Sequence, residues 1–195
     1  NMQENSFKFF VLNYWRSIDK KILFCFFILF FLGLFFSFSS TSSLAGERLN
    51  KDYYFFFTKH LIFVFLALSL MFFISFIEIN NFRKTIIPIF VIFFITLFLV
   101  PLIGVEVKGS KRWLSLYYFR LQPVELLKPF LILLTAKILS FQKDRPTNYA
   151  YIISFLTLLA VIILLINQPD IGQSILLVGT WITIVFISGI SLFYI

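Results

Sequence analysis

The chain has 195 residues, enough by length for one or two soluble domains, but 60% of them are hydrophobic and only 13% are charged. In ordinary soluble domains about 45 to 50% of the residues are hydrophobic and about 25% are charged. The net charge of +8 is spread over short segments between apolar runs, which favours contact with lipid headgroups or anionic ligands over nucleic acid. Backbone that crosses lipid must form helices or a closed β-barrel. The alternation of apolar and polar residues that barrel strands need is absent from this sequence. We therefore predict an all-α, polytopic membrane protein.

Crossing the hydrocarbon takes a helix of about 20 apolar residues. Five clear runs of this kind lie, in chain order, at about 22–40, 61–77, 86–104, 149–166 and 175–195. A sixth, at about 124–141, is interrupted by Lys128, Pro129 and Lys137, yet its middle is too apolar to lie in water. We predict six transmembrane helices in a domain over 22–195, preceded by an N-terminal segment over 1–21.

Lysine and arginine in the connecting segments predict the orientation, because cytoplasmic loops are enriched in them. With the N-terminus inside, the cytoplasmic segments hold nine basic residues and the outer segments eight. One outer segment, 105–128, supplies five of the eight, and without it the count is nine against three. We predict a cytoplasmic N-terminus and an outer segment that binds an anionic group.

The first polar motif lies in that outer segment and reads Gly109-Ser110-Lys111-Arg112-Trp113. Arginine presents a planar fork of donors to phosphate oxygens, lysine adds charge, and tryptophan suits the membrane interface. The motif therefore fits a lipid-linked phosphate. Simple anchoring of span ends among headgroups is an equally good interpretation, so both stay open.

The second motif, Gln122-Pro123-Val124-Glu125, has the pattern of a helix start, since proline is favoured at the first helical position and an acid in the first turn. Glu125 and Lys128 are three residues apart, so they can pair on one helix face. Ionisable groups near membrane depth are functional candidates. A purely structural ion pair is the alternative.

The third motif runs from Asn167 to Gln173 and contains Gln168, Pro169 and Asp170. A carboxylate in an outer crevice can act as a general base or a metal ligand. Asp170 and Gln173 also have the spacing of a helix-capping box, so capping is the competing interpretation. With His60 as the only histidine, neither a His-based triad nor a histidine metal cluster can be built.

The three motifs taken together, G-S-K-R-W, L-Q-P-V-E-L-L-K-P and N-Q-P-D-I-G-Q-S, resemble the signatures of the SEDS family of cell-wall polymerases, which includes FtsW, RodA and SpoVE. The segment Val105–Gly109 before the Arg-Trp pair is most similar to the division branch, FtsW. The family usually has serine where this chain has Val124. Family members have about ten spans. The resemblance therefore implies that these six spans are the first ones, the N-terminal part of a longer protein.

The resemblance implies a glycosyltransferase that polymerises lipid II into glycan strands at the outer face of the bacterial inner membrane, at the division septum. The implied partners are a class B penicillin-binding protein and divisome membrane proteins. The catalytic carboxylate is expected beyond Ile195, so this part alone is expected to be inactive. The residues implied to bind substrate are Lys111, Arg112, Trp113, Gln122, Glu125 and Lys128, with Gln168, Pro169 and Asp170 supporting the crevice.

No tightly bound cofactor is expected, although a divalent cation, Mg²⁺ or Mn²⁺, on Asp170 is considered. Three alternatives to the division polymerase stay open. One is a RodA-type elongation polymerase, one a flippase that moves a lipid-linked precursor across the bilayer, and one a noncatalytic scaffold. Charged groups at interrupted helix ends also suit a transport path.

Overall fold

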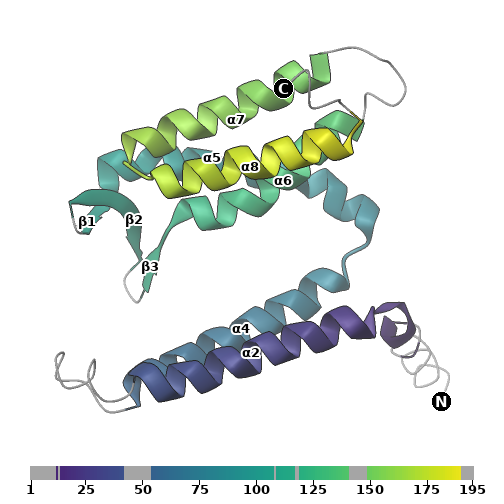
Figure 1. The fold of residues 1–195 in the computed structure, drawn as a ribbon, viewed down its shortest axis with the longest axis vertical. Helices are drawn as coiled ribbons and strands as arrows, with labels where there is room; N and C mark the ends of the chain where they lie inside the picture. Colours follow the sequence, from purple (N-terminus) through teal and green to yellow (C-terminus); the bar gives the residue numbers. More distant parts are fainter. Residues whose placement is uncertain are drawn as a thin grey trace. The chain divides into compact units, whose positions relative to one another are not determined.

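The structure is a computed structural model that describes residues 12, 14–41, 54–107, 109–116, 119–140 and 149–189. The chain divides into two compact units, Asn1–Ile77 and Glu78–Ile195, called here the N-terminal and the C-terminal unit. Each has its own packing (Figure 1).

Within the described residues of the N-terminal unit, two long helices, α2 (Lys20–Thr41) and α4 (Phe55–Ser75), pack against each other. The Asp19 carboxylate accepts hydrogen bonds from the backbone N–H groups of Lys21, at 2.9 Å, and Ile22, at 3.3 Å. It thereby caps the free donors at the start of α2. No residue of α4 is buried within the protein, and most of its exposed side chains are apolar. Such a helix suits lipid contact around most of its circumference.

The C-terminal unit is built from α5 (Ile79–Ile103), α6 (Pro123–Ser140), α7 (Tyr149–Asn167) and α8 (Ile171–Ile187). Helix α6 packs against each of the other three. Its buried residues recur every three or four positions, the spacing of one helix face. They include Val124, Leu127, Leu131 and Leu134, which join the apolar core. The valine at 124 is fully buried there, so an apolar side chain suits this position.

A small antiparallel sheet follows α5, with strands β1 (Val105–Val107), β2 (Ser110–Leu116) and β3 (Phe119–Leu121) in that order. Gly109, between β1 and β2, has a φ of 79°, which favours glycine. The prediction of an all-α chain is therefore wrong over this segment. Strands this short are missed when a sequence is searched for runs long enough to span a membrane.

Each of the six predicted apolar runs lies mostly within a helix, but residues 76–77, 104 and 188–189 at the ends of three runs are described and are not helical. Four of the helices, α2, α4, α5 and α7, are long and apolar enough to cross a membrane. Helix α8 is apolar but shorter, and α6 carries Glu125, Lys128 and Lys137. The six-span count, the cytoplasmic N-terminus and the boundary between 1–21 and 22–195 stay predictions. Residue 141 and residues 190–195, the ends of two predicted spans, lie outside the described residues.

Candidate functional site

Three segments that are distant in sequence meet at one end of the C-terminal unit: strand β2, the start of α6, and the turn that joins α7 to α8 (Figure 1). Strand β2 packs against both α5 and α6. Each segment carries one of the three polar motifs. The fold therefore assembles the motifs into one site.

Arg112 on β2 binds the α7–α8 turn. Its Nε donates a hydrogen bond to the carbonyl oxygen of Gln168 at 3.0 Å, and a terminal nitrogen donates to the carbonyl oxygen of Pro169. Its other terminal nitrogen lies 3.8 Å from a carboxylate oxygen of Asp170. The Arg112 side chain remains 33% exposed. The guanidinium is thus fixed in direction but can still be reached from outside.

Asp170 is held from two sides, because Gln122 Nε2 donates to its second carboxylate oxygen at 3.1 Å. It occupies the N-cap position of α8, yet its side chain makes no capping hydrogen bond. The capping-box interpretation of Asp170 and Gln173 is therefore wrong. The carboxylate turns toward Arg112 and Gln122, where an opposite charge and an amide donor replace the helix N–H groups. Only 9% of the Asp170 side chain is exposed.

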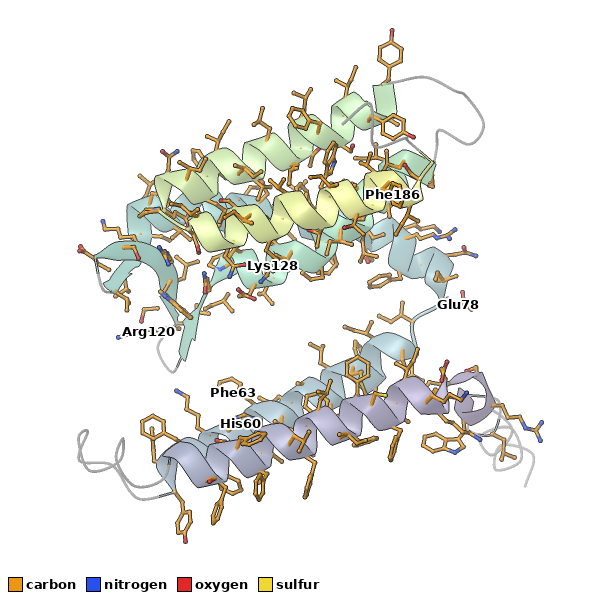
Figure 2. All side chains as sticks on the ribbon, in the orientation of Figure 1. His60, Phe63, Glu78, Arg120, Lys128 and Phe186 are labelled. Atoms are coloured by element: carbon orange, nitrogen blue, oxygen red, sulfur yellow. The ribbon has the colours of Figure 1, made fainter. Side chains whose placement is uncertain are left out.

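A second cluster joins α6 to α8. Lys128 Nζ lies 2.7 Å from Glu125 Oε2 and donates to Gln173 Oε1 at 3.0 Å. Gln173 Nε2 donates in turn to Glu125 Oε1 at 3.0 Å. Figure 2 places Lys128 on α6 where it runs along α8. The predicted Glu125–Lys128 pair is confirmed. The sequence pattern indicates only a capping position for Gln173, whereas in the structure this residue ties the pair to α8.

Lys111 and Trp113 lie on β2 together with Arg112, but they stand apart from these contacts. Lys111 is exposed and pairs with Glu106 across the sheet, and Trp113 is half-buried opposite Val105. Within the described part of the chain, neither joins the hydrogen bonds that connect Arg112, Gln122 and Asp170. Their expected contact with substrate stays a prediction.

The cation considered at Asp170 does not fit the described residues well. Divalent magnesium or manganese prefers about six oxygen ligands. In the described part of the chain, no group of three or more His, Cys, Asp or Glu side chains gathers in one place. The Asp170 carboxylate already accepts a hydrogen bond from Gln122. It also faces Arg112, whose positive charge repels a cation. Its role as a metal ligand stays untested, and no chemical step below depends on it.

The geometry supports the binding of an anion. Arginine has five N–H donors, and the contacts above leave part of this set free on an accessible guanidinium. Lys128 adds a second cation, with its Nζ held by Glu125 and Gln173. Both cations are fixed by neighbours, so little reorganisation is needed when an anion arrives.

Comparison with known proteins identifies the family of the chain. The family model described as "Cell cycle protein", FTSW/RODA/SPOVE, matches residues 19–195. A probable peptidoglycan glycosyltransferase FtsW of Wigglesworthia glossinidia brevipalpis is 33% identical over 184 residues, 89% of this chain and 48% of that protein. The chain spans about half the length of the curated relatives it matches.

Solved structures give the same result. A chain from a peptidoglycan synthase complex superposes with a TM-score of 0.72 at 26% identity, over 89% of this chain and 48% of that one. The rod shape determining protein RodA of Thermus thermophilus superposes with a TM-score of 0.64 at 27% identity, over 82% and 54%. This protein therefore belongs to the SEDS family of multi-pass membrane proteins, the family of FtsW, RodA and SpoVE.

Proposed function

We propose that the protein polymerises lipid II into glycan strands at the outer face of the inner membrane, and that it serves septal wall synthesis during division. The observation that carries the proposal is the pair of positioned cations, Arg112 and Lys128, each held by acidic or amide partners. The similarity to a protein named as a peptidoglycan glycosyltransferase supports the reaction class.

The chemistry follows from charge. When a glycosyl group leaves a lipid-linked diphosphate, negative charge grows on the leaving oxygens. Arg112 can donate to these oxygens while its contacts to the α7–α8 turn keep its direction. Lys128 adds a point charge on the same side of α6 as Glu125. These residues would bind and stabilise the leaving group.

The proposed partner is a class B penicillin-binding protein, acting together with divisome membrane proteins. Support comes from the similarity to a chain of a peptidoglycan synthase complex, in which polymerization and crosslinking are coordinated. The polymer made by one protein would then be the substrate that the other crosslinks.

The experiment uses the full-length protein with its penicillin-binding partner in liposomes that contain fluorescent lipid II. We expect long glycan strands, which a muramidase digests. Arg112→Ala, Glu125→Ala and Asp170→Ala should each reduce the product. Translocation of lipid II in sealed vesicles without polymer would contradict the proposal and favour the flippase. Normal growth of cells that carry each of the three variants as the only copy would favour a scaffold.

A further inference from the structure

We propose that Gln168 is a positioning residue. Its side chain replaces a backbone hydrogen bond that is missing in α5, and it thereby fixes the turn that holds Arg112. The hydrogen bond is missing because of Pro101 near the end of α5. Proline has no N–H, so the carbonyl oxygen four residues earlier, that of Leu97, has no helical donor. A bare carbonyl in a buried apolar region is strongly unfavourable, because no water can reach it.

Gln168 supplies the missing donor. Its Nε2 donates to the Leu97 carbonyl oxygen at 3.0 Å, and the Gln168 residue is only 3% exposed. Leu97 itself is fully buried in the core. The hydrogen bond therefore fixes the α7–α8 turn to α5 at the position where the helix has lost its own bond.

The backbone of the same residue faces the site. The Gln168 carbonyl accepts from Arg112 Nε at 3.0 Å, and the next carbonyl, of Pro169, accepts from the Arg112 guanidinium. The turn also has its own bonds, from the N–H groups of Gln168 and Asp170 to the Leu165 carbonyl. Those bonds shape the turn, whereas the side chain of Gln168 fixes where it lies against α5.

Two consequences of losing Gln168 can be separated. One is an unpaired Leu97 carbonyl, which lowers stability. The other is a turn that is free to shift, which changes the direction of the Arg112 guanidinium. Small displacements of a charge-stabilising group have large effects on rate. The second consequence rests on the proposed function where rate is the readout, but the motion of the turn can be measured without it.

The test compares Gln168→Leu, Pro101→Ala and the double variant in the full-length protein in lipid nanodiscs. Alanine at 101 restores a backbone N–H for the Leu97 carbonyl. We expect Gln168→Leu alone to lower the thermal midpoint by several degrees, and the double variant to recover most of that loss. Pro88→Ala is the matched control, because it restores a donor elsewhere in α5. It should not rescue Gln168→Leu.

The positioning role is measured by amide hydrogen exchange over 167–170 and by polymer formation. In the double variant we expect faster exchange in the turn and a rate still well below wild type, although stability has returned. Recovery of exchange and rate together with stability would reduce Gln168 to a structural residue and overturn the proposal. The proposal would also be overturned if the changes in thermal midpoint caused by Pro101→Ala and by Gln168→Leu were simply additive in the double variant. If even the wild type makes no polymer while stability and exchange behave as expected, the proposed function fails and the positioning of the turn stands.

Discussion

Asp19 in the N-terminal unit and Asp170 in the C-terminal unit stand directly before an apolar helix, and the sequence around each is typical of a helix start. Asp19 caps α2 through its carboxylate. Asp170 makes no side-chain cap and instead binds Gln122 and lies beside Arg112. The N-terminal unit brings no competing partner to Asp19, among the contacts the structure describes. A polar residue in an apolar chain thus takes its role from the elements that other parts of the chain bring to it.

The same contrast extends to the two units. Helices α2 and α4 of the N-terminal unit pack against each other, and α4 buries no residue. The C-terminal unit has a core and, at one end, a set of polar side chains that connect β2, α6, α8 and the α7–α8 turn. Packing in lipid has little hydrophobic driving force, so such polar contacts and close packing specify the arrangement.

The largest expected effect is a loss of activity when an arginine of the C-terminal unit is removed but not when one of the N-terminal unit is removed. Arg112→Ala removes the guanidinium from the site, and polymer formation should fall on the order of 100-fold, as for the loss of a charge-stabilising donor. Arg112→Lys keeps the charge but loses the fork, so an intermediate rate is expected. Arg16→Ala, at an exposed arginine of the N-terminal unit, is the control. Equal losses in Arg112→Ala and Arg16→Ala would remove the distinction between the units.

The next effect concerns close packing at two glycines. A Cβ on Gly104, at the end of α5, would clash with the Val100 carbonyl oxygen, so the backbone must move. Gly104→Ala should lower the free energy of unfolding by about 1–3 kcal/mol. A Cβ on Gly33 would meet His60 Nε2 at 3.7 Å, an ordinary contact. Gly33→Ala should therefore be tolerated. Denaturant unfolding in detergent measures both, and a tolerated Gly104→Ala would contradict the described geometry.

The two aspartates give a smaller and more specific pair of results. Asp19→Ala should lower helix stability by about 1 kcal/mol, and Asp19→Asn should retain most of it, because asparagine also caps. Asp170→Asn should leave the helix content of α8 unchanged and reduce polymer formation, because Arg112 loses its opposite charge. Circular dichroism and the lipid II assay separate these outcomes. Loss of helix in Asp170→Asn with normal activity would return Asp170 to the capping interpretation.

The smallest effect is expected for the Glu125–Lys128 pair. The Glu125 side chain is 48% exposed, so its ion pair is partly screened by solvent. A double-mutant cycle with Glu125→Gln and Lys128→Met should give a coupling of about 0.2–1 kcal/mol in unfolding stability. The coupling should weaken with salt. A value of several kcal/mol would mean that the pair is far better shielded from solvent than the structure describes.

Long apolar runs, the start of α6 at Pro123 and the pairing of Glu125 with Lys128 could be predicted from the sequence, because each depends on neighbouring residues. Helix formation in lipid follows from local hydrophobicity, since every backbone group must bond within its own segment. The three polar motifs, taken together, also identified the family, which the comparisons confirm.

The partners of the site could not be predicted in this way. Arg112 and Gln168 are 56 residues apart, Gln122 and Asp170 are 48 apart, and Gln168 and Leu97 are 71 apart. Two of the acceptors are backbone carbonyls, which every residue type possesses, so no pattern of residue types marks them. The long apolar helices and the family of the chain can thus be read from the residue pattern alone. That Asp170 faces Arg112 and that Gln168 reaches Leu97 becomes visible in the fold, because those contacts depend on how helices and strands far apart in the chain pack together.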